Sequence, residues 1–168
     1  MVPENQIIFR LRAAIREKHR KYLRYLETGE VNENEPYIIA INGDLIPYNM
    51  ADSGDQCSFI VKSVYPIGSH AIVFDSAFQE VSSGFAYRPE IKKANGSTVD
   101  TTVFQDETFS GVSAIIYSCA NVADGHRELG DEFQFLHNPT AANPVPRGWL
   151  QKGREIWRES DQLYFKDW

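Results

Sequence analysis

Residues 37–41 have the sequence Tyr-Ile-Ile-Ala-Ile, a continuous apolar run rich in β-branched side chains that ends at Asn42-Gly43-Asp44. The run does not alternate apolar with polar residues, which is the pattern of a strand covered on both faces. We therefore expect a central strand of an α/β sheet here. Residues 70–74 form a second run of this kind, closed by Asp75. We expect it to lie parallel to the first strand through a right-handed crossover.

Two amphipathic helices are expected beside these strands. From about Gln6 to Leu26, apolar residues recur at spacings of three and four, which is the period of a helix with one buried face. Asp52 and Ser53 can cap a second helix over about residues 53–64. Together with the strands, these helices give the βαβ order of an α/β fold.

A β-hairpin and two more strands are expected in the second half of the chain. Residues 85–92 and 98–104 flank Asn95-Gly96, a turn sequence that tolerates positive φ at both central positions. Residues 112–119 form another apolar run, and residues 132–137 include phenylalanines that alternate with polar side chains. We expect both of these segments to join the central sheet.

The remaining segments are polar or rich in proline. We expect an exposed loop at 121–131, an extended segment wrapping the surface from Asn138 onward, a short helix at 149–159 and a terminal segment at 163–168. The whole predicts a single α/β domain over residues 1–168, with a mixed, largely parallel central sheet, flanking helices, an inserted β-hairpin and an extended C-terminal wrap. A chain of 168 residues buries enough surface to fold without a metal or a disulfide.

Charge is distributed unevenly along the chain, whose formal net charge is −6. Residues 6–26 carry seven basic residues and one acid, so the rest of the chain is strongly acidic. Arg12, Arg16, Arg20 and Arg24 follow one another at spacings of four and line one helix face. This row predicts either a face that docks on the chain's own acidic body or a surface for nucleic-acid phosphates or an acidic protein partner.

The two cysteines, Cys57 and Cys119, stand on separate expected elements without metal-ligand spacing. We expect buried free thiols in a reducing compartment, with a disulfide as the alternative. The longest apolar runs are too short for a transmembrane helix, and no basic-then-apolar leader follows Met1. These features predict a cytoplasmic protein without a membrane partner.

Two aspartates follow the expected parallel strands, Asp44 and Asp75. Because ligands of open α/β sheets bind beyond the carboxyl ends of parallel strands, these carboxylates could hold Mg²⁺ for phosphoryl-transfer chemistry. The alternative is that both are ordinary turn residues. The common phosphate-loop, nucleophile-elbow and zinc-protease motifs are absent from the sequence.

His137 ends an expected strand and is followed directly by Asn138-Pro139, near Glu132. A histidine at such a position could act as a general base or bind a phosphate. A structural role is the alternative, because no partner acid can be identified from spacing.

Several stretches carry a family resemblance. They are the Arg12, Lys18 and Tyr22 spacing, the segments 36–43 and 111–118, Phe135-Leu136-His137-Asn138-Pro139, and Pro144 with Pro146. In this order they resemble the C-terminal region of a group of uncharacterised bacterial proteins, which are in turn distantly similar to restriction-endonuclease-like nucleases of the PD-(D/E)xK type.

The resemblance implies an Asp and an acid-x-Lys pair that hold Mg²⁺ and the attacking water. Glu90-Ile91-Lys92 has the acid-x-Lys spacing, with Asp75 upstream as the first acid. The catalytic half of such nucleases ordinarily precedes the basic helix, where this chain begins. We therefore expect either the C-terminal part of a longer protein or a reduced, non-catalytic relative.

Two functions follow from these observations, ahead of a small-molecule hydrolase that would use His137 and Asp75 and has no supporting spacing. The first is a non-catalytic interaction or structural module, indicated by the missing catalytic motifs and the acidic body. The alternative is a metal-dependent nuclease-like protein, or a nucleic-acid-binding remnant of one, that uses the basic N-terminal helix. The overall acidity of the chain favours the first.

Overall fold

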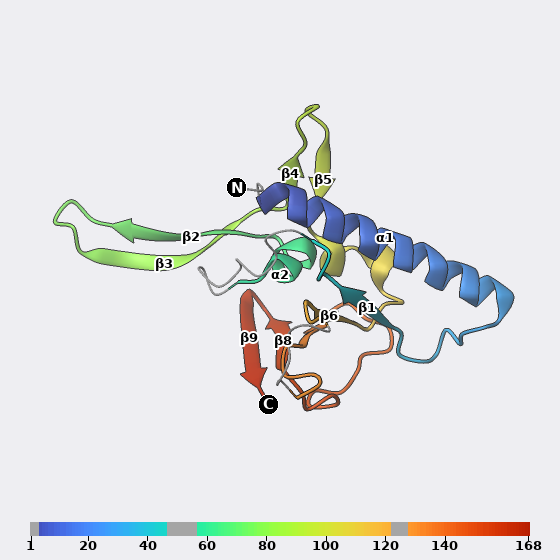
Figure 1. Ribbon diagram of the computed structural model, residues 1–168. Helices are drawn as coiled ribbons and strands as arrows, with labels where there is room; N and C mark the ends of the chain where they lie inside the picture. The colour runs from blue at the N-terminus through green and yellow to red at the C-terminus, as the bar shows by residue number, and fades with distance from the viewer. Residues whose placement is uncertain (1–3, 47–56, 122–127) are drawn as a thin grey trace.

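The computed structural model describes residues 4–46, 57–121 and 128–168 (Figure 1). Its centre is a five-stranded sheet with the strand order β1-β6-β7-β8-β9. The strands are β1 (Ile38–Asn42), β6 (Ala114–Ser118), β7 (Gln134–His137), β8 (Arg154–Glu159) and β9 (Gln162–Asp167). β1 is parallel to β6 and β7 is parallel to β8, whereas the other two pairings are antiparallel. The mixed α/β class is confirmed, although parallel pairings make up half of the sheet rather than most of it.

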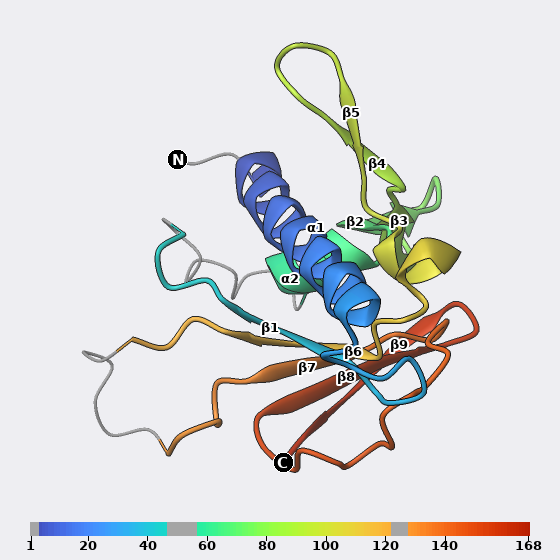
Figure 2. The same ribbon diagram turned by 90° about the vertical axis from the view of Figure 1, so that its right-hand side faces the viewer.

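One face of this sheet is covered by helices (Figure 2). They are α1 (Glu4–Thr28), α2 (Phe59–Val64) and the short 3₁₀ turns η2 (Val103–Gln105) and η3 (Glu107–Phe109). The main apolar core lies between these helices and the sheet, where Leu11 and Ile15 of α1 join Ile39 and Ile115 of the strands. The predicted long N-terminal helix is therefore present, with a buried face that packs on the sheet.

The opposite face of the sheet is covered by the proline-rich segment that follows β7. Val145 of this segment packs against Ala114 and Phe135, and Ile38 and Leu150 lie against the same cluster. Strand β1 is fully buried only on its helix side, at Ile39 and Ile41; on the other side Ile38 is half-buried and Ala40 is exposed. It is an edge strand and not a central one, since it pairs only with β6.

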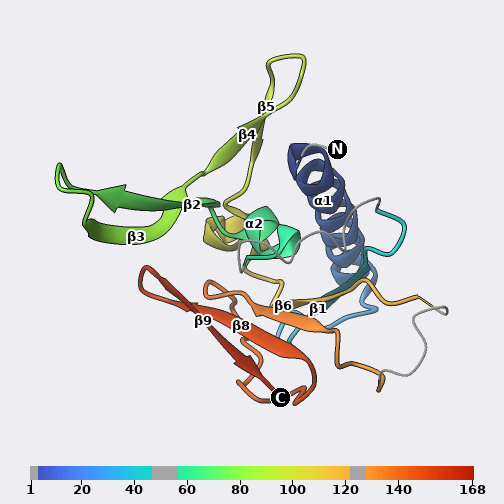
Figure 3. The same cartoon turned by 60° about the vertical axis from the view of Figure 1, so that its left-hand side comes forward.

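Residues 70–74 do not form the predicted parallel neighbour of β1. They belong to β2 (Ile67–Phe74), which pairs antiparallel with β3 (Glu80–Tyr87) to form a separate two-stranded hairpin. We call this hairpin the arm, because it projects away from the sheet and helices (Figures 1 and 3). Its turn is held by Asp75, whose side chain accepts hydrogen bonds from the main-chain N–H groups of Ala77 and Gln79. Closing this short local turn costs less chain entropy than a crossover to β1.

The hairpin predicted around Asn95-Gly96 exists, but its strands are shorter than expected. They are β4 (Glu90–Lys92) and β5 (Thr98–Asp100). Residues 85–87 belong instead to the arm, and residues 103–105 form the turn η2. The proposed caps of the second helix, Asp52 and Ser53, lie outside the described residues, and α2 begins at Phe59.

The predicted helix at 149–159 is wrong, because this stretch contains β8, which turns back into β9. Its residues alternate between the two faces of the sheet, with Ile156 in the main core and Glu155 on the opposite face beside His137. Pairing with β7 and β9 overrides the local preference for a helix. Within the described ranges, no helix is both long and apolar enough to cross a membrane.

A glycine at the start of β8 allows the closest backbone approach in this region. Gly153 has a φ of +66°, and a Cβ atom there would lie 2.2 Å from the main-chain oxygen of Phe133. Gly96 has a φ of +83° but open space around it. Substitution of these two glycines by alanine therefore distinguishes two costs. At Gly96 only the left-handed backbone conformation is unfavourable, whereas at Gly153 a steric clash is added.

We predict that Gly96→Ala lowers the free energy of unfolding by about 1 kcal/mol, the cost of a left-handed backbone at a residue with a Cβ. Gly153→Ala adds a main-chain clash to this cost, and we expect a loss of about 3 kcal/mol or more. Urea unfolding followed by circular dichroism measures both. Equal losses for the two variants would contradict the packing described at Gly153.

Candidate functional site

The residues of the expected nuclease triad do not come together. Asp75 lies at the turn of the arm, whereas Glu90 and Lys92 lie on β4 in the other hairpin, and the two hairpins diverge (Figures 1 and 3). Glu90 and Lys92 are exposed and face Asp100 and Thr98 across the β4–β5 ladder. Among the residues that the structure describes, no group of three His, Cys, Asp or Glu side chains is placed to hold a metal ion.

The expected magnesium pair is also separated. Asp44 follows β1 and accepts a hydrogen bond from the Asn121 side chain at 2.9 Å, so it links two strand ends of the central sheet. Asp75 belongs to the arm, which is not part of that sheet. Both aspartates act as turn residues, which is the alternative that the sequence left open.

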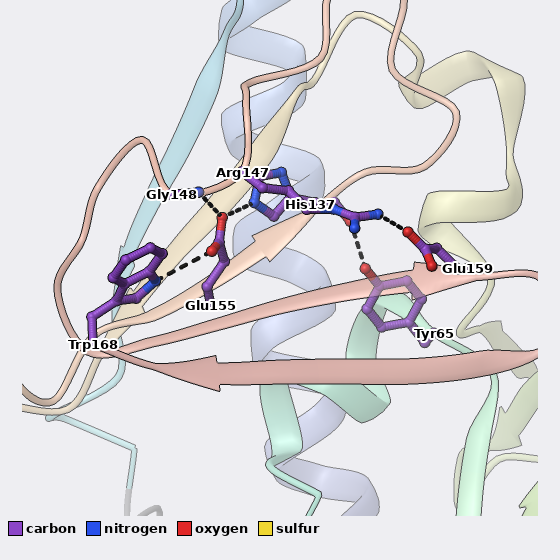
Figure 4. A network of polar contacts seen from close by, with 7 residues as sticks. All are labelled: Tyr65, His137, Arg147, Gly148, Glu155, Glu159 and Trp168. Atoms are coloured by element: carbon purple, nitrogen blue, oxygen red, sulfur yellow. Dashed lines mark hydrogen bonds and ion pairs between the residues drawn. The ribbon is translucent and has the colours of Figure 1, made fainter.

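His137 does have a partner acid, and this acid comes from the neighbouring strand. Its Nε2 atom lies 2.7 Å from Oε1 of Glu155, and the two residues are only 8% and 4% exposed (Figure 4). Glu155 stands eighteen positions further along the chain, within the segment expected to be a helix. Spacing in the sequence therefore gave no means of finding this pair.

The Glu155 carboxylate binds three groups from three segments of the chain. Besides His137, it accepts a hydrogen bond from the Gly148 N–H at 2.8 Å and one from the Trp168 indole at 3.2 Å. Burial by itself raises the pKa of Glu155, but the hydrogen bonds from Gly148 and His137 outweigh it and hold that pKa below its ordinary value. The carboxylate is thus charged and fully satisfied, as a buried acid requires.

The cluster around His137 and Glu155 joins several segments of the chain. The Tyr65 hydroxyl donates to the main-chain oxygen of His137 at 2.5 Å, which joins the end of α2 to the same strand (Figure 4). Arg147 pairs with Glu159 and lies 4.6 Å over the Trp157 ring, closing the outer side. These contacts surround His137 and Glu155, and both residues are buried.

The basic row on α1 is split between the interior and the surface. Arg12 is 2% exposed and reaches Asp100 at 3.5 Å; burial lowers its pKa to about 10, although Asp100 acts against this. Arg16, Arg20 and Arg24 are exposed, and in the described ranges they form no ion pair with an acidic side chain. The surface part of the row is therefore these three arginines, and Arg12 is not available to a phosphate.

A large hollow lies on the helix side of the sheet, beyond the end of α2. It has a volume of about 1200 Å³ and is bounded by α2, the base of the arm and strands β8 and β9. Its apolar lining includes Val61, Ile67, Phe85, Ile156, Leu163 and Phe165. Arg154 and Arg158 lie along it, paired with Asp167 and Asp161 respectively. We call this hollow the groove.

The arm carries a bulky apolar face that continues from the groove. In its antiparallel register, His70 lies opposite Phe85, so the alternate positions Ile72, Phe74 and Tyr87 share their side of the hairpin. The other side is mostly small, with Ala71 opposite Gly84. Phe74 is 55% exposed and Tyr87 is 71% exposed, and Phe78 at the turn is 86% exposed.

Large contiguous apolar patches on the surface of folded proteins are often sites of interaction. Sequence reasoning missed both the groove and the arm. The arm's signal was present, because Gly84 and Ala86 alternate with Phe85 and Tyr87, as in a hairpin with one small face. The groove had no sequence signal, since its walls come from three distant segments.

Comparisons with protein family models, with curated proteins and with solved structures each gave no match. The expected relationship to PD-(D/E)xK nucleases therefore stays a prediction. The evidence for function lies in the surfaces of the chain itself.

The Glu155 tie predicts a specific pH dependence of stability. Because the folded pKa is lower than the ordinary 4.5, the charged carboxylate stabilises the fold above about pH 4.5, and this contribution is lost as pH falls through the folded pKa. We expect Glu155→Gln to lower the free energy of unfolding at pH 7 by about 2–3 kcal/mol, with a smaller difference from wild type below pH 4.5.

Urea unfolding at a series of pH values measures this difference. Glu159→Gln is the matched control, because Glu159 lies on the same strand in an exposed pair, where the loss is at most about 0.5–1 kcal/mol. A Glu155→Gln difference that stays constant from pH 7 to pH 3 would contradict a charged carboxylate in the native state.

Proposed function

We propose that this chain is a non-catalytic module that binds another polypeptide through the groove and the apolar face of the arm. The observation that carries the proposal is the continuity of these two surfaces, since Ile67, Phe85 and Tyr87 of the arm also line the groove. Protein-binding sites have this composition, with a concave apolar centre rich in aromatic side chains and a polar rim that contains arginine.

The dispersal of the candidate catalytic residues also supports a binding role. Asp75, Glu90 and Lys92 lie on two hairpins, and His137 is enclosed by structural contacts. The groove itself offers hydrogen-bonding groups, such as Ser58 and Gln134, which bond to each other, beside its apolar walls. Such groups orient a bound peptide without acting on it chemically.

We also propose that the module works in the cytoplasm. Cys57 and Cys119 are not joined in a disulfide, and Cys57 lies in the wall of the groove. A reducing compartment keeps such thiols in this state.

Panning a displayed library of random linear peptides against the immobilised chain tests the proposed function. We expect enrichment of peptides with spaced apolar and aromatic residues, which match the walls of the groove. Phe165→Ser removes a half-exposed wall residue, and we expect it to weaken binding of an enriched peptide at least about tenfold by fluorescence polarisation.

Lys166→Ser is the matched control, because the neighbouring residue on β9 points to the opposite side of the sheet and does not line the groove. Its peptide affinity should equal that of wild type. If enriched peptides bind Phe165→Ser as tightly as wild type, the groove is not the binding site.

We propose nucleic-acid binding as a second candidate function, because the exposed part of α1 offers unpaired cationic side chains. Arg16, Arg20 and Arg24 extend along about 12 Å of a 25-residue helix, a spacing that can follow successive phosphates. Such a surface fits the nucleic-acid-binding remnant suggested by the nuclease resemblance. The acidity of the whole chain weighs against it, so this function ranks second.

Fluorescence anisotropy with labelled single- and double-stranded DNA tests this candidate. We expect Arg16→Glu with Arg20→Glu to abolish binding, and the wild-type affinity to fall with salt at a log–log slope of about −0.9 per phosphate contacted. Lys152→Glu with Lys166→Glu makes the same change in net charge away from α1 and should bind like wild type. Equal affinities of the two double variants would exclude α1 as the binding surface.

A further inference from the structure

We propose that the occupant of the groove is the arm of a second copy of this chain, so that two copies exchange arms about a twofold axis. This inference rests on the proposed function, because it names the partner of the same surface. Each chain supplies both halves of the contact, a projecting apolar hairpin and an apolar groove beside its base (Figures 1 and 3). A twofold contact needs such a self-complementary pair of surfaces.

The arm has the length that reciprocal exchange requires. Both of its strands have eight residues, so the arm extends about 26 Å from base to turn. Its base lies at the groove, and its distal part extends away from it (Figure 3). If two arms lie side by side in opposite directions, the distal part of each reaches the base of the other. Phe74 and Phe78 of one copy then come to the groove of its partner.

The chemistry of the distal arm matches the lining of the groove. The arm presents Ile72, Phe74 and Phe78, which have no apolar cover in the described part of the chain and are 47%, 55% and 86% exposed. The groove wall presents Leu163 and Phe165, of which Phe165 is 57% exposed. Aromatic side chains meeting such walls supply most of the binding energy in protein interfaces.

The area available is sufficient for a stable dimer. A fully covered Phe or Tyr side chain buries about 150–250 Å², so the exposed parts of Ile72, Phe74, Phe78, Phe85 and Tyr87 amount to roughly 600 Å² per copy. Two such arms and the walls they cover together bury on the order of 2,000 Å². Stable interfaces of standard size bury about 1,200–2,000 Å².

The groove offers arginine donors to an acidic turn, beside the acid Asp161 that also lines it. The turn of the arm carries Asp75 and Glu80, and both are exposed. The groove carries Arg154 and Arg158, whose guanidinium groups have more donors than their pairs with Asp167 and Asp161 use. An acidic turn that reaches the arginine side of the groove gains favourable electrostatics at both ends of the twofold contact.

Sedimentation equilibrium of the full chain at micromolar concentrations tests the exchange. We expect a mass twice that of the 19.1 kDa chain. Ile72→Ser with Phe74→Ser removes the distal arm face, and Phe165→Ser removes part of the groove wall. Each should raise the dimer dissociation constant at least about tenfold, with unchanged circular dichroism because all three side chains are largely exposed.

Val73→Ser is the matched control, since Val73 lies on the opposite face of the same strand and is equally exposed. It should leave the dimer unchanged. An equimolar mixture of the arm variant with the Phe165→Ser variant keeps one intact arm and one intact groove in each mixed pair. We therefore expect this mixture to dimerise more strongly than either variant alone.

A wild-type chain that sediments as a monomer overturns the exchange, as does a dimer that the arm and groove variants leave intact. A dimer weakened by the arm variant but not by Phe165→Ser also overturns it, because the arms would then pack on each other. A monomeric chain that still binds enriched peptides, with loss in Phe165→Ser, overturns the homodimer and leaves the proposed peptide-binding function standing.

Discussion

The buried carboxylate of Glu155 is the interaction on which the second half of the molecule depends. It joins β7 through His137, the proline-rich wrap through Gly148 and the end of the chain through Trp168 (Figure 4). An unsatisfied charge in this position would cost several kcal/mol, so all three segments are held to one arrangement. That arrangement places the wrap over the sheet face opposite the helices, and the strands can then be apolar on both sides.

The same strand that carries this tie also forms the floor of the groove. Neighbouring side chains of a strand point to opposite faces, so fixing Glu155 on one face directs Arg154, Ile156 and Arg158 to the other. α1 packs against β1, which lies at the opposite end of the sheet from β9. The sheet extends past α1 to β8 and β9, and the groove lies over these two strands.

Local sequence patterns predicted which helices, strands and turns form better than they predicted which strands pair with each other. The long α1 helix, the strand at 37–41, the Asn95-Gly96 turn and the extended wrap all follow from periodicity and turn chemistry, which act within a few residues. The pairing of β1 with β6 and the place of β8 depend on contacts between distant segments. For the same reason the sequence showed His137 as a candidate but could not show Glu155. The sequence also grouped Arg12 with the three surface arginines. A spacing of four residues shows that side chains share one helix face, but it does not show which of them are buried.

Packing within the described part of one chain does not explain the exposed apolar side chains of the arm. The three apolar clusters of the described core contain no residue of the arm beyond its first position, Ile67. Selection for stability alone would make such a hairpin polar on both sides, since an exposed apolar edge promotes association. Here one side carries most of the bulky apolar side chains, such as Ile72, Phe74 and Phe85, and the other side is mostly small. The residues of the arm are thus suited to a surface that lies outside the isolated chain, and the groove beside its base has matching chemistry.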